Sequence, residues 1–122
     1  MKWKISYLSA ENIIYIKTHG KVSVTSIKAM INEAQSIQKK YKSKAALIDH
    51  RKLFGKLSTM DIYSQPEFLN ALSVPMNMKL AIIFLQSQYE DFKFLETVSK
   101  SRGYSIAIFL DVKSAKKWLI NT

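Results

Sequence analysis

The side chains best suited to proton transfer are two histidines, His19 and His50, and Asp49 stands directly before the second. A histidine that is oriented by a carboxylate can act as a general base. No nucleophile elbow, glycine-rich phosphate loop or paired metal-ligand motif accompanies them, and the chain contains no cysteine. We therefore expect no catalysis, no metal and no cofactor. A small enzyme that uses His19 and His50 is kept as an alternative.

A second group of polar residues follows the predicted strands. Strands that lead into helices run parallel, so their carboxyl ends share one edge of the sheet, and ligands of open α/β sheets bind there. Lysine and arginine side chains at that edge, together with helix N-termini, favour an anionic group. The residues predicted to bind a ligand at this edge are His19, Lys21, His50, Arg51, Lys52 and Ser87.

These residues are placed by an alternation of two hydrophobic periods. Alternating apolar and polar residues predict strands, whereas apolar residues at a spacing of three and four predict helices. Short runs that are wholly apolar are typical of strands covered on both faces. Pro66 lies inside one predicted helix and is expected to kink or divide it. In chain order, the expected elements are strands at 2–8 and 13–18, a helix at 23–42, a strand at 45–48, a helix opening at Ser58, a strand at 80–85, a helix at 88–102, a strand at 106–110 and a helix opening at Asp111.

The order β-β-α-β-α-β-α-β-α predicts an α/β fold. Helical crossovers between apolar strands require parallel pairing, and the first two strands form an antiparallel hairpin. We expect a mixed, mostly parallel five-stranded sheet flanked by four helices. The chain has 122 residues, of which 48% are hydrophobic, and this suits a single domain over residues 1–122.

The chain is strongly basic, with 19 lysines and arginines against 9 acidic residues. Such a balance raises nucleic acid, anionic lipid or an acidic protein as partners. The aromatic residues fall mostly on core positions rather than among the cations, which disfavours nucleic acid. Peripheral membrane contact stays open, and an edge strand could pair with a second copy in a homodimer. The longest apolar run, 80–85, is too short to span a bilayer, and no signal-peptide core is present, so we expect a cytoplasmic protein.

Several segments together resemble a known family. They are Gly20 before an amphipathic helix, LIDHR at 47–51, LAIIF at 80–84, and RGYSIAIF at 102–109 followed by Asp111, Ala115, Trp118 and Leu119. This pattern resembles the SpoIIAA-like group of STAS domains over nearly the whole chain. The resemblance implies a sheet flanked by helices and a regulatory module without catalytic activity.

The resemblance also implies two kinds of function. Some STAS domains are anti-sigma-factor antagonists that are switched by phosphorylation of a serine at the start of the helix after the third strand. Ser58 and Thr59 lie nearest that place, although the segment GKLSTMD at 55–61 lacks the Asp-Ser-x-Gly motif of the antagonists. The SpoIIAA-like branch is also similar in organisation to CRAL-TRIO lipid-transfer domains, which implies a small hydrophobic ligand.

We therefore expect a non-catalytic, STAS-like regulatory or ligand-binding module. Its partner would be a protein or a small amphiphilic, lipid-like ligand, and a basic rim beside an apolar pocket would fit an anionic head group. The binding groove is expected along the carboxyl edge, near the helix that contains Pro66 and the last helix. A phospho-regulated anti-sigma-factor antagonist is the alternative.

Overall fold

The computed structural model describes residues 1–121, and its strands form one five-stranded sheet in the order β1-β2-β3-β4-β5. β1 and β2 are antiparallel, and every other neighbouring pair is parallel, as the sequence predicts. The elements are β1 (Lys2–Leu8), β2 (Ile13–Lys21), α1 (Val24–Tyr41), β3 (Ala45–Phe54), α2 (Thr59–Ala71), β4 (Lys79–Ile83), a short 3₁₀ helix η1 (Gln86–Gln88), α3 (Tyr89–Ser101), β5 (Ser105–Phe109) and α4 (Val112–Ile120).

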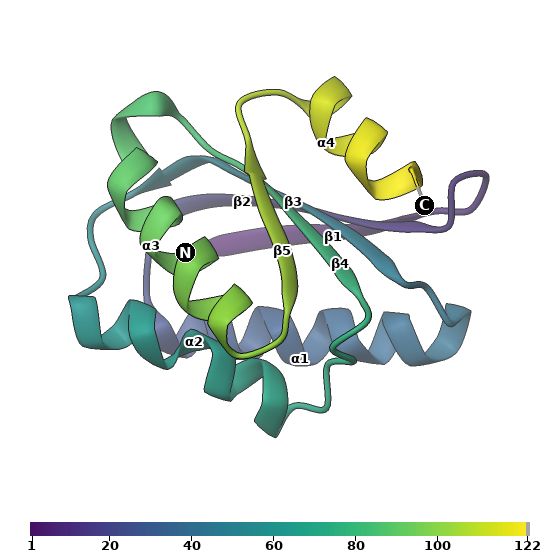
Figure 1. Ribbon diagram of the computed structural model, residues 1–122, viewed down its shortest axis with the longest axis horizontal. Coiled ribbons are helices and arrows are strands. Elements are labelled where there is room, and N and C mark those ends of the chain that lie inside the picture. The colour runs from purple at the N-terminus through teal and green to yellow at the C-terminus, as the bar shows by residue number, and fades with distance from the viewer. Residues whose placement is uncertain (122) are drawn as a thin grey trace.

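The order of the strands decides which face each helix covers. From β2 to β5 the chain moves steadily across the sheet, and right-handed crossovers in one direction place their helices on one face. α1, α2 and α3 therefore share a face. α4 follows the last strand and packs on β3, β4 and β5 from the other side (Figure 1). Within residues 1–121, the backbone of α4 does not come close to β1 or β2, although side chains of both strands, such as Leu8 and Ile13, join the core beneath it.

Two apolar cores result, one on each face of the sheet. The larger lies under α1, α2 and α3 and includes Ile48, Leu80 and Ile106. The smaller lies under α4 and includes Leu47 and Ile83. Because β3 and β4 contribute to both cores, their side chains are apolar at successive positions rather than at alternate ones. This burial explains the two short apolar runs.

Three helices, α1, α2 and α4, begin within one residue of the start that the sequence predicts, and each is capped by a side chain. Ser23 Oγ accepts a hydrogen bond from Ser26 N at 3.1 Å at the start of α1. Ser58 caps α2 and Asp111 caps α4 in the same way. Each cap satisfies a backbone N–H that the helix itself leaves free. Within residues 1–121, no helix combines the length and hydrophobicity needed to cross a bilayer.

Several elements differ from the prediction. β3 continues to Phe54 instead of stopping at residue 48, because its last residues pair with the end of β2, which itself runs to Lys21. β4 ends at Ile83, and the chain turns into η1 two residues earlier than expected. Pro66 does not divide its helix, since α2 is one continuous element in which Pro66 is fully buried. Packing of the ring offsets the hydrogen bond that proline cannot donate.

β3 also contains a bulge that no periodicity indicated. Lys17 of β2 lies opposite Asp49, and His19 lies opposite Lys52. Between these two pairs β3 advances by three residues while β2 advances by two, so β3 contains one extra residue. An extra residue reverses the facing of all the side chains beyond it. Leu53 therefore lies on the side of α1–α3, and Lys52 remains exposed.

Candidate functional site

The main cavity lies between the sheet and helices α1, α2 and α3, and its volume is about 140 Å³. Of its lining residues, Gly55 is exposed and Gln88 is half-buried. The cavity therefore reaches solvent between the end of β3 and η1, at the carboxyl edge of the parallel strands. Its walls are formed by Val22, Ile27, Met30, Ile31, Ile48, His50, Leu53, Gly55, Leu57, Ile62, Gln65, Leu69, Leu80, Ile82, Gln88, Asp91, Phe92, Leu95, Ser99 and Ile106.

A smaller cavity of about 70 Å³ adjoins the main cavity. The two share Met30, Ile31, Ile48, Leu69 and Leu80 as walls. Methionine is unbranched and adapts its shape easily. Movement of the Met30 side chain, which lines both cavities, would therefore change the shape of both.

The walls of the main cavity are mostly apolar, and the polar groups among them are few. They are His50, Gln65, Gln88, Asp91 and Ser99. Neither lysine nor arginine lines the cavity, and Asp91 is its one carboxylate. Ser99 is fully buried, and its hydroxyl has no hydrogen-bond partner among the described residues. A mostly apolar cavity with a few polar groups is typical of a site for a small organic molecule.

His50 is the most constrained of these polar groups. Only 8% of the residue is exposed. Its Nδ1 lies 2.7 Å from Thr18 Oγ1. Its ring stacks on that of Phe92, with the ring centroids 5.5 Å apart. Burial lowers the pKa of His50 to about 4, although the negative charge of Asp49 acts in the opposite direction. The ring is therefore neutral at physiological pH.

Gln88 connects η1 to the end of β3 at the rim of the cavity. Its Nε2 donates to the carbonyl oxygen of Leu53 at 3.2 Å and to that of His50 at 3.4 Å. Its Oε1 accepts from the backbone N–H of Leu85 at 2.7 Å. One side chain thus holds the two segments between which the cavity reaches solvent.

The six residues predicted to bind a ligand do not form one site. His50 alone lines the main cavity. Ser87 is exposed in η1, next to Gln88. Lys21 is exposed, and its aliphatic chain lies beside Gly55, a residue of the cavity wall. A Cβ atom added to Gly55 would lie 3.3 Å from Lys21 Cγ. This places the stem of Lys21 at the rim rather than inside.

The remaining three residues, His19, Arg51 and Lys52, lie on the opposite face of the sheet, where Lys52 is the β3 partner of His19. Thr18 points to His50, so His19, the next residue of β2, points away from it. The two histidines therefore share no cleft. Arg51 pairs with Asp49, with Arg51 Nη2 2.8 Å from Asp49 Oδ2. Burial opposes ionisation of Asp49, but the hydrogen bonds from Arg51 outweigh it and lower the pKa of the carboxyl.

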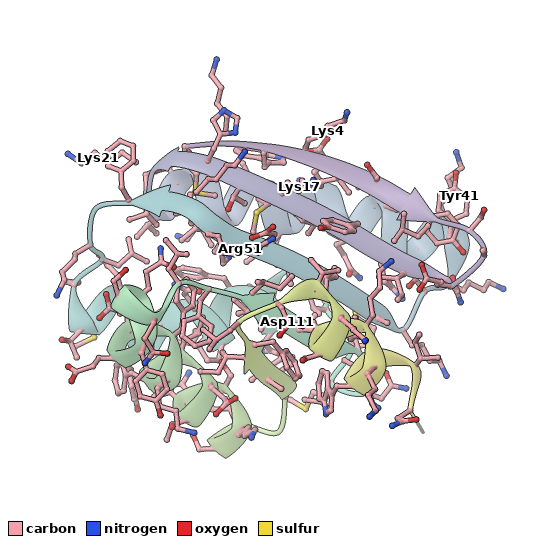
Figure 2. The ribbon with its side chains drawn as sticks, turned by 90° about the horizontal axis from the view of Figure 1, so that it is seen from above. Lys4, Lys17, Lys21, Tyr41, Arg51 and Asp111 are labelled. Carbon is pink, nitrogen blue, oxygen red and sulfur yellow. The ribbon has the colours of Figure 1, made fainter. Side chains whose placement is uncertain are left out.

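The part of this opposite face that α4 leaves open is basic. Lys4 and Lys17 lie over β1 and β2, and Arg51 lies beside them on β3 (Figure 2). Asp111, at the start of α4, is near enough to Arg51 for the two charges to interact. We call the exposed surface of Lys2, Lys4, Lys17, His19 and Arg51 the basic face. It is separated from the main cavity by the thickness of the sheet.

Two further expectations concern the helices around the site. α2, which contains Pro66, does line the main cavity, through Ile62, Gln65 and Leu69. The expectation that the last helix would border the same groove is wrong, because α4 packs on the other face of the sheet. Ser58 and Thr59 are exposed at the start of α2.

Several residues of the cavity escaped the analysis of the sequence. Strict alternation along β3 from Ile48 and His50 would turn Lys52 and Phe54 inward, and the bulge brings Leu53 in instead. Gln88 and Ser99 belong to helical segments in which a polar residue is ordinary. Gln88 does follow the fourth strand at the carboxyl edge, and helical spacing from Phe92 and Leu95 puts Gln88 and Ser99 on one face, but neither signal indicates a function.

No group of three or more histidine, cysteine, aspartate or glutamate side chains within residues 1–121 is arranged to hold a metal ion. Neither a protein-family model nor a curated protein sequence matches the chain.

Proposed function

We propose that this protein is a non-catalytic binding module for a small, mainly apolar ligand that carries a polar group. The observation that carries the proposal is the main cavity, which is apolar, reaches solvent beside Gln88 and contains the buried side chain of His50. The resemblance to SpoIIAA-like STAS domains supports the same reading, as does their similarity to lipid-transfer domains.

The size of the cavity limits what it could hold. A cavity of about 150 Å³ in another protein, lined by leucine, isoleucine and phenylalanine, binds benzene. The 140 Å³ of the main cavity therefore suits one ring or a short chain. A longer acyl chain would need the neighbouring 70 Å³ as well, with displacement of Met30.

The direct test is binding of toluene to the full chain, followed by methyl NMR of Met30, Ile48 and Ile106. We expect these methyl signals to shift while those of the α4 core, such as Ile83, stay in place. Shifts spread evenly over both cores, or none at all, would contradict the proposal. Native mass spectrometry of protein purified from its host would show which molecule is bound in the cell.

A matched pair of variants distinguishes an effect on ligand binding from an effect on the stability of the fold. Leu95 lines the main cavity and Leu119 lies in the α4 core, and the two are 7% and 8% exposed. Replacing either by alanine should cost about 2–5 kcal/mol of unfolding free energy. Leu95→Ala alone enlarges the cavity, so it alone should strengthen toluene binding. Equal effects of Leu95→Ala and Leu119→Ala on binding would count against the site.

A phospho-regulated module that binds a protein partner is the second candidate. What favours it is the exposure of Ser58 and Thr59 at the start of α2, a helix that also lines the main cavity. A phosphate there would meet the positive end of the helix dipole. If Ser58→Asp leaves every interaction of the purified protein in a host extract unchanged, this candidate is lost.

A further inference from the structure

The hydrogen bonds around Thr18 determine which nitrogen of His50 carries the proton. Thr18 Oγ1 lies 3.1 Å from the carbonyl oxygen of Asp49 and 2.7 Å from His50 Nδ1. The carbonyl can only accept, and a hydroxyl has a single proton to give. Both contacts are satisfied when Thr18 donates to Asp49 and His50 Nδ1–H donates to Thr18. A neutral ring then has its lone pair on Nε2.

That lone pair has no partner in the protein. Among residues 1–121, no group is hydrogen-bonded to His50 Nε2, while the residue lines the main cavity. Nδ1 is held against β2, so Nε2 is the nitrogen left for a bound molecule. Among the described residues, the fully buried polar atoms without a partner are the hydroxyls of Ser99 and Tyr104, so Nε2 keeps access to the cavity. The hydroxyl of a bound molecule can reach it there and donate a hydrogen bond.

The surroundings also determine the charge of that ligand. No lysine or arginine lines the cavity, since Lys21 is an exposed residue whose stem lies at the rim, and the walls already contain the carboxylate of Asp91. The ring of His50 is neutral, because burial lowers its pKa. An anion placed here would lose its hydration without gaining an opposite charge. An uncharged donor has no such penalty.

From these observations, and resting on the proposed ligand-binding function, we propose that the main cavity selects a small uncharged molecule with a hydroxyl group, of the phenol or alcohol class, and that His50 Nε2 accepts the hydrogen bond from this hydroxyl. This assignment differs from the amphiphile with an anionic head that the sequence suggested.

Ser99 is the polar residue of the cavity whose side chain is fully buried without a partner among the described residues, and its position assigns it a lesser role. It lies seven residues after Phe92 on α3, about 10 Å along the helix. Phe92 stacks on His50, and Gln88 at the rim donates to the His50 carbonyl. His50 is therefore near the solvent end of the cavity, where a polar head group would remain. Ser99 marks the far end.

The experiment compares phenol with toluene, which have nearly the same shape, by calorimetric titration of the full chain at pH 7. We expect phenol to bind the wild-type protein. His50→Leu should weaken phenol about tenfold, the value of one good hydrogen bond, and leave toluene nearly unchanged. Ser99→Ala is the control and should leave the preference between the two probes as it is in the wild-type protein.

The outcomes separate this inference from the proposed function. If the wild-type protein binds toluene but excludes phenol, the inference is overturned and the binding function stands. If it binds neither, both are overturned. Benzyl alcohol and benzoate test the charge, since they differ little in size. Tighter binding of benzoate would overturn the assignment of an uncharged ligand.

A measurement on the wild-type protein alone covers the case in which His50→Leu does not fold. Long-range ¹H–¹⁵N spectra of the imidazole distinguish a protonated from an unprotonated nitrogen. We expect Nε2 to be unprotonated in the free protein and its resonance to move when phenol is added. A proton on Nε2, or a resonance that does not respond to bound phenol, would overturn the inference.

Discussion

Lys4 and Lys17 lie directly opposite each other on the basic face, one in β1 and the other in β2. Like charges at opposed positions of an antiparallel pair repel each other. We expect Lys4→Glu to replace this repulsion by attraction and to raise the free energy of unfolding by about 0.5 kcal/mol. Urea unfolding at low salt would measure the gain.

Lys2→Glu is the matched control for that variant. It makes the same change of charge on the same strand and face, but Lys2 lies opposite His19. The gain from Lys4→Glu should exceed that of the control at low salt and shrink in 1 M salt, where charges are screened within about 3 Å. Equal gains from both variants would mean that net charge alone is responsible.

Tyr104→Phe should stabilise the protein. The Tyr104 hydroxyl is buried and has no hydrogen-bond partner within residues 1–121, so its removal spares the cost of desolvating it. We expect about 1 kcal/mol by thermal or urea unfolding. Tyr7→Phe is the control, because the Tyr7 hydroxyl donates to Asn12 Oδ1, and it should destabilise. A loss of stability in Tyr104→Phe would mean that the hydroxyl does have a partner in solution.

The stability of the protein should fall as the pH drops from about 6.5 to about 4. In the unfolded chain His50 takes up a proton near pH 6.5, whereas in the fold its pKa is about 4. Between these values the unfolded state binds more protons, so the stability from a neutral His50 is complete above about pH 6.5 and is lost toward pH 4. The loss is on the order of 3 kcal/mol.

His50→Leu should remove this part of the pH dependence, and His19→Leu, at an exposed position, should retain it. The lowered pKa of Asp49 adds a further loss in acid, and Asp91 also lies along the cavity wall. Both carboxyls are present in all three proteins, so the difference between the profiles isolates His50. Superimposable profiles for wild type and His50→Leu would contradict the assignment.

Gln88→Ala should open the rim of the main cavity. The substitution removes the hydrogen bonds to the carbonyls of His50 and Leu53 and to the N–H of Leu85. We expect a loss of about 1 kcal/mol, faster amide exchange at Leu85 and faster release of toluene in NMR line shapes. Gln86→Ala changes an exposed residue of the same 3₁₀ helix and serves as the control. Unchanged toluene release in Gln88→Ala would mean that the exit lies elsewhere.

The fold could be predicted from the sequence because its signals are local. The runs at 45–48 and 80–85 are apolar at every position since α4 covers one side of β3 and β4 and the other helices cover the opposite side. Ser23, Ser58 and Asp111 begin their helices by bonding to a backbone N–H three residues ahead. Such contacts depend on neighbours in the chain and leave a readable pattern.

The candidate site could be predicted only in part, because it depends on contacts between distant segments. The main cavity does open at the carboxyl edge, but the ligand residues expected at that edge included cations that lie outside the cavity. The helices of the three crossovers share one face, so the cavity lies beneath them. The hydrogen bond between Thr18 and His50 joins β2 to β3, and the sequence of either strand alone does not predict it.

The bulge in β3 takes up one extra residue without changing which side chains of that strand line the main cavity. Deletion of Arg51 would restore regular pairing with β2, while Lys52 would stay opposite His19 and Leu53 opposite Gly20. Leu53 would therefore remain in the cavity wall, and Asp49 would lose the guanidinium that pairs with it. The charge of the basic face can thus change at this position independently of the apolar lining of the cavity.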